Sequence, residues 1–186
     1  MSVPEALAEL AAARSPAIDE TLRARFGALL EAEPRLLHRD GGPGHMTASA
    51  FVVDAPGEHV ALLWHRKGGF WVQPGGHVEE DETSFERAAR REVAEEIGLA
   101  GLQRLGPGPA MLHHHGLDAA FGSCREHFDV QFLLRAPAPA AQLPLAPSPE
   151  SPRVCWARWE EYPAGTVADI VPTLRRLRPV VRELIG

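Results

Sequence analysis

The spacing of apolar residues predicts two helices near the N-terminus, over residues 3–14 and 16–31. In the second, Leu22 and Phe26 are four positions apart and begin an apolar stripe on one helical face. Ser15 is the expected N-cap of this helix, with a proline directly after it. We therefore expect residues 1–40 to form a helical extension packed on the main domain. A dimerisation arm is the alternative, so a homodimer is one possible state.

The remaining apolar segments are short, and several alternate with polar positions, which is typical of strands. They cover residues 47–53, 59–65, 70–72, 111–115, 126–134 and 153–159. Residues 54–57 (DAPG) predict a hairpin turn between the first two strands. Residues 136–152 contain six prolines and are expected to be an extended surface connection, either a passive loop or a flap over a cleft. A helix over residues 166–177, ended by Pro179, is expected to close the chain.

A further helix is predicted after a Pro-Gly-Gly turn at residues 74–76 and the acidic loop that follows it. Thr83 and Glu86 have the spacing of a capping box, with Thr83 as the N-cap. Gly98 supplies a left-handed stop at the other end. Positions i, i+3 and i+4 lie on one helical face, so three carboxylates gather in one patch. They are Glu92, Glu95 and Glu96.

Three like charges on one face would destabilise this helix without compensation. Hard divalent cations prefer oxygen ligands, and Mg²⁺ is usually shared between a few carboxylates, waters and substrate phosphates. The acidic patch therefore predicts a site for Mg²⁺ (or Mn²⁺) that acts on a phosphorylated substrate. A surface helix with clustered acids is the alternative.

Residues 91–99 (REVAEEIGL) match every defined position of the second half of the Nudix box, R-E-U-x-E-E-x-G-U, where U is a bulky aliphatic residue. Gly76 and Glu82 satisfy the first half, G-x5-E. Eight residues rather than seven then separate Glu82 from Arg91, which we interpret as one inserted residue ahead of the helix. Over roughly 27 residues, 73–99, the chain resembles the Nudix hydrolase family.

This resemblance implies an α/β fold, an α/β/α sandwich around a mixed β-sheet, in a domain over residues 41–186. It implies hydrolysis of a phosphoanhydride bond in a nucleoside diphosphate linked to another moiety, by attack of water at phosphorus. By position, the side chains of Glu92, Glu95 and Glu96 resemble the metal ligands. The carbonyl group of Gly75 or Gly76 resembles the backbone ligand, and Arg91 resembles the residue that orients the glutamates.

Candidates for substrate binding lie on both sides of the predicted strand at residues 70–72. They are Arg66, Lys67, Gly75, Gly76 and His77. Arg39 and His45 are further basic residues that would reach substrate phosphates. Ordinary solvated surface charge is the alternative for each basic side chain.

The water that attacks phosphorus must be oriented and deprotonated by a carboxylate or a histidine. Glu95 and Glu96 are the first candidates for this step. Strand 126–134 supplies others, because its polar residues would face the cleft of a half-buried sheet. These are Glu126, His127 and Asp129, and Glu79 is an additional candidate. A solvent-facing strand edge is the alternative for this polar face.

A net charge of −6 and a pI near 5.8 argue against a nucleic-acid polymer as partner, since such binding needs a basic face. A small phosphorylated substrate is compatible, because a bound metal supplies positive charge locally. Two cysteines make no disulfide framework, and neither a secretory leader nor a membrane-length apolar run is visible, so a cytoplasmic protein is expected. The run of histidines at 113–115 is not expected to bind zinc, because adjacent strand residues point to opposite faces.

Two other classes of function stay open. A non-catalytic nucleotide-ligand-binding module would keep the fold without turnover, and the extra residue after Glu82 is its only support. An isomerase on the same fold would need an acid/base cysteine near the diphosphate, and Cys124 and Cys155 lie outside the signature segment. Release of phosphate or nucleotide from a substrate panel separates hydrolysis from both.

Overall fold

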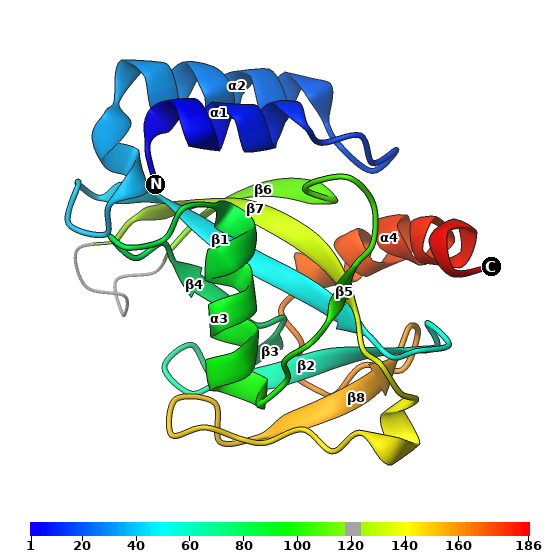
Figure 1. Cartoon of the computed structure of the whole chain (residues 1–186). Coiled ribbons are helices and arrows are strands. Elements are labelled where there is room, and N and C mark those ends of the chain that lie inside the picture. Colours follow the sequence, from blue (N-terminus) through cyan, green and yellow to red (C-terminus); the bar gives the residue numbers. More distant parts are fainter. Residues whose placement is uncertain (118–123) are drawn as a thin grey trace.

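A computed structural model describes residues 1–117 and 124–186, which build one mixed sheet with helices on both of its faces (Figure 1). The helices are α1 (Val3–Ala11), α2 (Glu20–Ala32), α3 (Phe85–Ile97) and α4 (Ile170–Ile185), with short 3-10 turns at Pro34–Leu37 and Ala140–Gln142. The strands are β1 (Gly44–Val53), β2 (His59–His65), β3 (Phe70–Val72), β4 (Gly75–His77), β5 (Gln103–Arg104), β6 (Met111–Gly116), β7 (Glu126–Arg135) and β8 (Val154–Arg158). None of the helices in the described part of the chain is both long and apolar enough to cross a bilayer.

The sheet is organised around the parallel pair of β1 and β7. Their register runs from Gly44 opposite Glu126 to Val53 opposite Arg135. The main strand order is β3-β2-β1-β7-β5, while β4 pairs with β1, β6 with β7 and β8 with β2, all antiparallel. The predicted hairpin joins β1 to β2, and the prediction of an α/β fold around a mixed sheet is confirmed.

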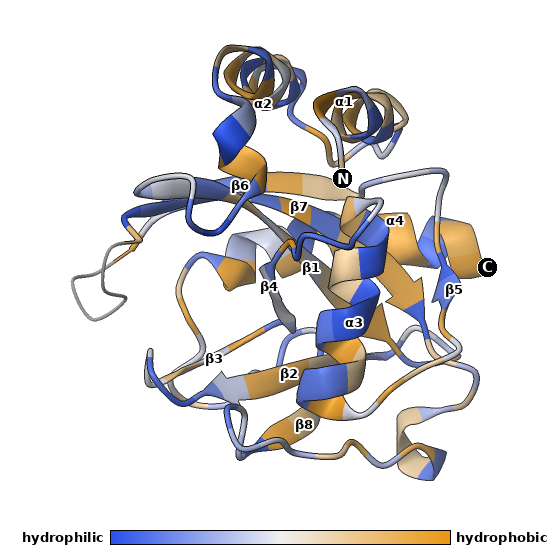
Figure 2. Cartoon of the chain, turned by 60° about the vertical axis from the view of Figure 1, so that its left-hand side comes forward, coloured by the Kyte–Doolittle hydropathy of each residue, from blue (hydrophilic) through white to orange (hydrophobic). Residues whose placement is uncertain are grey.

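Alternate residues of β1 belong to two hydrophobic cores. Met46 and Ala48 pack in the core that contains α1, α2 and α3, whereas Phe51 and Val53 pack in the core that contains α4. This follows from the two-residue period of a strand, whose successive side chains point to opposite faces. In Figure 2, α3 shows hydrophilic and hydrophobic bands, as expected of a helix with one face on a core and the other toward solvent.

The N-terminal helices lie side by side above the sheet in Figure 1 and share the core of α3. Their fully buried residues in that core include Ala6, Phe26 and Leu30. The N-terminal helices are therefore packed on the sheet and on α3. A domain division at residue 40 and a homodimer stay predictions.

The two predicted N-caps, Ser15 and Thr83, are both wrong. α2 begins at Glu20, where the carboxylate of Asp19 accepts a hydrogen bond from the Leu22 N–H at 3.1 Å. The Ser15 hydroxyl instead accepts a hydrogen bond in the preceding turn.

In α3, the side chain of Ser84 rather than Thr83 caps the helix. Its hydroxyl accepts a hydrogen bond from the Arg87 N–H at 3.1 Å. Ser and Thr both cap helices, so their adjacent positions in the sequence do not reveal which one does so. The predicted left-handed stop at Gly98 is confirmed, with φ of 71°.

We had predicted that the last helix begins at residue 166 and is ended by Pro179. Both predicted bounds are wrong. α4 runs from Ile170 to Ile185 with this proline inside it. Val180 and Val181 follow the proline and are buried in the α4 core. Burial of these two side chains stabilises the continued helix against the cost of the proline.

Candidate active site

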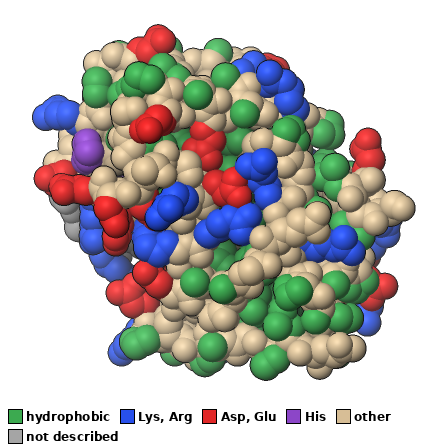
Figure 3. Space-filling model, viewed as in Figure 1, with side chains coloured by type: hydrophobic (Ala, Val, Ile, Leu, Met, Phe, Trp, Pro, Cys, Tyr) green, Lys and Arg blue, Asp and Glu red, His purple; other side chains and the backbone are tan. Residues whose placement is uncertain are grey.

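A cleft of about 1540 Å³ lies along β4 and α3. It is lined by basic residues, by acidic residues of α3 and by β4, which contains Gly75 and Gly76. The lining includes Arg39, Arg66, Lys67, Gly75, Gly76, His77, Arg91, Glu92, Glu95, Glu96 and His127. Figure 3 shows acidic and basic side chains next to one another on the face that α3 occupies. The structure therefore brings most of the predicted site residues to one cavity.

The guanidinium of Arg91 contacts three carboxylates. Its Nε donates to Glu82 at 3.0 Å, and its Nη1 donates to Glu92 at 2.8 Å and to Glu95 at 3.0 Å. Its Nη2 donates to the carbonyl oxygen of His77 at 2.8 Å. The inserted residue is thus accommodated in the loop without separating Glu82 from Arg91. Arg91 thus links the carboxylates of Glu82, Glu92 and Glu95 to β4 by hydrogen bonds.

Glu92 approaches the backbone of Gly76 closely. A Cβ atom added to Gly76 would lie 2.4 Å from the Oε1 atom of Glu92, so only glycine leaves room for the carboxylate here. Burial raises the pKa of Glu92, and the negative charge of Glu95 adds to this effect, while Arg91 opposes it. A partly buried carboxylate next to the backbone carbonyl groups of β4 offers the oxygen ligands that Mg²⁺ or Mn²⁺ prefers.

Both carboxylate oxygens of Glu96 accept hydrogen bonds. The N–H of Gly75 donates to one at 3.0 Å, and the hydroxyl of Ser151 donates to the other at 3.1 Å. Burial, and to a lesser degree the nearby charge of Glu92, raise the pKa of Glu96 to about 7 against the effect of these hydrogen bonds. A cation beside Glu92 and Glu96 would favour their ionised forms, so these residues fit the implied metal.

Ser151 is a site residue that the sequence did not reveal. It is fully buried, and it lies near the end of the proline-rich segment 136–152, which we had expected to be either a passive loop or a flap over a cleft. A lone serine among prolines carries no recognisable signal, because its contact with Glu96 joins positions 55 residues apart.

Glu95 is the most exposed of the three signature glutamates. Its side chain is 59% exposed, compared with 15% for Glu92. Glu79 also lines the cleft and lies 4.0 Å from Arg91. The exposed carboxylate of Glu95 is therefore accessible to a substrate or a water molecule in the cleft.

The polar residues of β7 are divided between different environments. His127 lines the cleft, and burial together with the nearby His45 lowers its pKa to about 3. Asp129 is buried and accepts hydrogen bonds from Thr47 at 3.0 Å and Ser49 at 2.6 Å. The alternative of a solvent-facing strand edge is therefore wrong.

Glu126, which we had predicted as a catalytic candidate, is not among the described residues that line the cleft. Its carboxylate contacts the ring of His114 at 2.7 Å instead. The predicted substrate residue His77 does line the cleft, but His45 does not. The Nε2 atoms of these two histidines are 2.7 Å apart, and burial lowers the pKa of His77 to about 4.

Comparisons with known proteins agree with this architecture. The family model described as the NUDIX domain matches residues 43–177, whereas no curated protein matches the chain.

Solved structures with a similar fold include a NUDIX-family hydrolase from Clostridium perfringens, with a TM-score of 0.59 and 21% identity over 75% of this chain and 97% of that one. An Ap4A hydrolase from C. elegans gives a TM-score of 0.57 and 18% identity, over 74% of this chain and 98% of that one. The E. coli dihydroneopterin triphosphate pyrophosphohydrolase gives a TM-score of 0.56 and 18% identity, over 75% and 94%. At these identities the structures show a shared fold. With the family match over most of its length, the chain belongs to the Nudix hydrolase family.

Proposed function

We propose that the protein is a Mg²⁺- or Mn²⁺-dependent pyrophosphohydrolase that cleaves a phosphoanhydride bond in a small nucleoside diphosphate derivative. The observation that carries this proposal is the convergence of Glu92, Glu95 and Glu96 on one cleft with the Gly75–Gly76 backbone. Membership of the Nudix family supports it.

In this proposal Glu92, Glu96 and the backbone of Gly76 hold the metal, together with Glu95. When bound, the cation supplies positive charge that neutralises the diphosphate and the developing charge on the leaving phosphate. Arg91 keeps the carboxylates in place through its hydrogen bonds to Glu92 and Glu95. A fixed arrangement lowers the cost of assembling the charged site around each substrate molecule.

Glu95 and Glu96 are the proposed acceptors of the proton from the attacking water. A general base works best when its pKa is near the operating pH. Burial raises the pKa of Glu96 to about 7 in the metal-free protein, and a bound cation would lower it, which keeps this carboxylate ionised. The pKa of His127 is lowered to about 3, which makes His127 a weak base. Glu126 is set aside because it contacts His114 outside the cleft lining.

Arg39, Arg66 and Lys67 are the proposed contacts for the substrate phosphates, because all three line the same cleft as the acidic patch that a metal would neutralise. The cleft is larger than the roughly 300–1,000 Å³ typical of small-molecule sites, so it has room for a nucleotide with a second moiety. Two structures of similar fold are named an Ap4A hydrolase and a dihydroneopterin triphosphate pyrophosphohydrolase, and both names denote small phosphorylated substrates. A cytoplasmic location stays a prediction.

Turnover measurements test the proposal. The protein is incubated with Mg²⁺ and nucleotide sugars, dinucleoside polyphosphates, ADP-ribose, coenzyme A and oxidised nucleoside triphosphates, and released phosphate and nucleotide are measured. We expect turnover of at least one substrate, and a loss of about 100-fold in Glu95→Gln and Glu96→Gln. Glu31→Gln, an exposed position on α2, is the matched control. Losses of only a few-fold in both site variants would place the chemistry elsewhere.

The two alternatives have less support than before. The non-catalytic module relied on the extra residue after Glu82, yet Glu82 lies 3.0 Å from Arg91. Tight nucleotide binding without product would revive it. The isomerase needs a cysteine at the diphosphate, and neither Cys124 nor Cys155 is among the described residues that line the cleft.

A further inference from the structure

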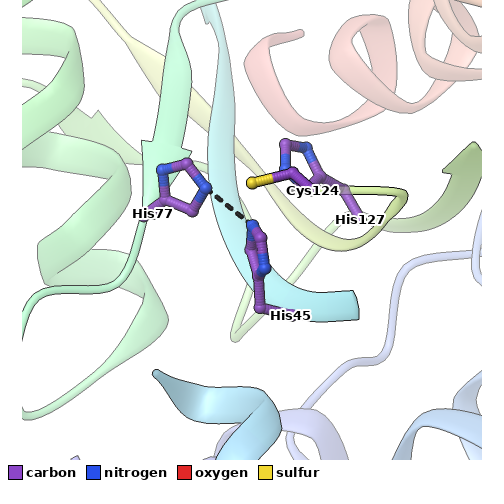
Figure 4. Close-up of side chains that lie close together, drawn as sticks. All are labelled: His45, His77, Cys124 and His127. Atoms are coloured by element: carbon purple, nitrogen blue, oxygen red, sulfur yellow. Dashed lines mark hydrogen bonds between the residues drawn. The ribbon is translucent and has the colours of Figure 1, made fainter. Parts of the chain in front are cut away.

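Three histidines and a cysteine converge beside the cleft, and two of the histidines, His77 and His127, also line it. The four residues are His45, His77, Cys124 and His127. Each offers one ligand atom, and these atoms all lie within 4.8 Å of one another. Figure 4 shows the three rings and the sulfur atom turned toward a common centre.

The strand register explains why the three rings share one face of the sheet. His45 in β1 lies opposite His127 in β7, and Thr47 in β1 lies opposite His77 in β4. Paired residues point to the same face, and so do residues two apart on one strand. The three rings are therefore fixed by adjacent paired strands, and Cys124 precedes the first residue of β7 by two positions.

The donor atoms are those that zinc prefers. Zn²⁺ is bound by thiolate sulfur at about 2.3 Å and by imidazole nitrogen at about 2.0–2.1 Å, in tetrahedral sites such as one cysteine with three histidines or the reverse. These bond lengths give ligand-to-ligand separations of roughly 3.3–3.6 Å. The Nε2 atoms of His45 and His77 are 2.7 Å apart, and the widest separation in the group is within 4.8 Å. Changes of about 1 Å in these separations would bring the four atoms into the range of a tetrahedral site.

A second observation points to a ligand at this place. The Nε2 atom of His127 is buried, and no hydrogen-bond partner for it exists among the described residues. Leaving a buried polar atom without a partner costs about 1–3 kcal/mol, so such atoms are uncommon unless something satisfies them. A hydrogen bond between His45 and His77 accounts for only two of the three rings.

We propose that His45, His77, Cys124 and His127 form a Zn²⁺ site that is separate from the glutamate site. Four protein ligands close the coordination shell, which is the arrangement of a structural rather than a catalytic zinc. The site adjoins the glutamate site, because the carbonyl oxygen of His77 accepts a hydrogen bond from Arg91 at 2.8 Å. Zinc would thus anchor β4 and, through it, the residue that orients the glutamates.

The run of histidines at 113–115 is not part of this site. His113 and His115 stack on one face with their Nδ1 atoms 3.2 Å apart, while the ring of His114 stacks on Phe128. The expectation that these three side chains do not converge on one ion is confirmed, and His113 serves as a control position.

Metal analysis of the full-length protein tests the proposal. The protein is purified without chelator, and its zinc content is measured by mass spectrometry. The metal is then replaced by Co²⁺, whose absorption spectrum reports tetrahedral geometry and thiolate coordination. We expect about one zinc per chain and a thiolate-to-cobalt charge-transfer band. Cys124→Ser should lose this band, and His45→Gln should lower the bound zinc at least tenfold.

Cys155→Ser and His113→Gln are the matched controls and should keep both the zinc content and the spectrum. Glu96→Gln should also retain zinc, which separates this site from the proposed Mg²⁺ site whatever the turnover measurements give. Circular dichroism of each variant shows whether it is folded. The proposal is overturned if the folded wild-type protein binds neither metal, or if Cys124→Ser and Cys155→Ser give the same cobalt spectrum.

Discussion

The carboxylate of Glu9 in α1 caps α3 by accepting a hydrogen bond from the Phe85 N–H at 2.6 Å. Its second oxygen accepts one from the Glu86 N–H at 3.0 Å. A negative charge at a helix N-terminus satisfies free N–H groups and interacts favourably with the helix dipole. The N-terminal extension is therefore hydrogen-bonded to α3, the helix that bears the signature glutamates.

Replacing Glu9 by alanine should destabilise the protein. Loss of a helix cap costs about 1–2 kcal/mol, which lowers the melting temperature of a protein of this size by roughly 2–8 °C. Thermal unfolding followed by circular dichroism measures the change, with Glu31→Ala on the exposed side of α2 as control. Identical melting curves for the two variants would show that the Glu9 contacts contribute nothing.

Replacing Arg91 by lysine should reduce turnover by about 10–100-fold, because residues that orient metal ligands contribute at this level. A lysine keeps the charge but lacks the forked guanidinium that contacts Glu82, Glu92 and Glu95 together. The control is Arg90→Lys, since Arg90 bonds to Glu86 on the side of the helix away from these acids. If both variants show equal kcat/KM, the orienting role of Arg91 is wrong.

Replacing Gly76 by alanine should weaken the binding of Mg²⁺ without unfolding the protein. The new methyl group would lie 2.4 Å from the carboxylate of Glu92, the mobile end of a side chain, which would move aside. We expect the Mg²⁺ concentration for half-maximal turnover to rise about 10–100-fold while the melting temperature stays nearly constant. Gly27→Ala in α2, where the nearest atom is at 3.6 Å, should leave the metal dependence unchanged. An unaltered Mg²⁺ titration of Gly76→Ala would contradict the assignment of Glu92.

The raised pKa of Glu96 predicts a pH dependence of stability in the metal-free protein. Burial lifts this pKa from 4.5 to about 7, so the folded state holds the proton more tightly than the unfolded state. The resulting stabilisation is complete below pH 4.5 and is lost as the pH rises through 7. In EDTA, the melting temperature of the wild type relative to Glu96→Gln should therefore fall between pH 5 and pH 8.

The pKa values of His77 and His127 are lowered, so their protonation destabilises the folded protein as the pH falls. Both histidines are present in the wild type and in Glu96→Gln, so their effect cancels in the comparison. Adding Mg²⁺ should remove most of the pH dependence, since a cation favours ionised Glu96. A difference in melting temperature that is flat with pH in EDTA would show that Glu96 titrates normally.

Local patterns were sufficient to predict the signature helix and the grouping of its three glutamates on one face. The spacing of Glu92, Glu95 and Glu96 fixes their common face by helix geometry alone, and Gly98 ends the helix as expected. The alternation of residues 126–134 likewise predicted the strand β7. The environments of its polar residues could not be predicted, because they depend on pairing with the buried strand β1.

Contacts between distant segments could not be predicted in this way. Glu9 meets Phe85 across 76 positions, and Ser151 meets Glu96 across 55, with no sequence pattern that links either pair. The convergence of His45, His77 and His127 depends on strand register, which a single sequence does not specify. The error at Pro179 has the same origin, because tertiary burial outweighed a local helix-breaking preference.

The parallel ladder between β1 and β7 has a consequence for how the chain folds. Each residue of β1 pairs with one 82 positions later, from 44 with 126 to 53 with 135. Ribosomes add about 5–20 residues per second, so one edge of β1 waits roughly 4–16 s for its partner during synthesis. Pairings over such sequence separations form slowly, whereas the bonds within α3 are local and form early. Nascent chains are thus most vulnerable to aggregation along this open edge of β1, before residue 135 leaves the ribosome.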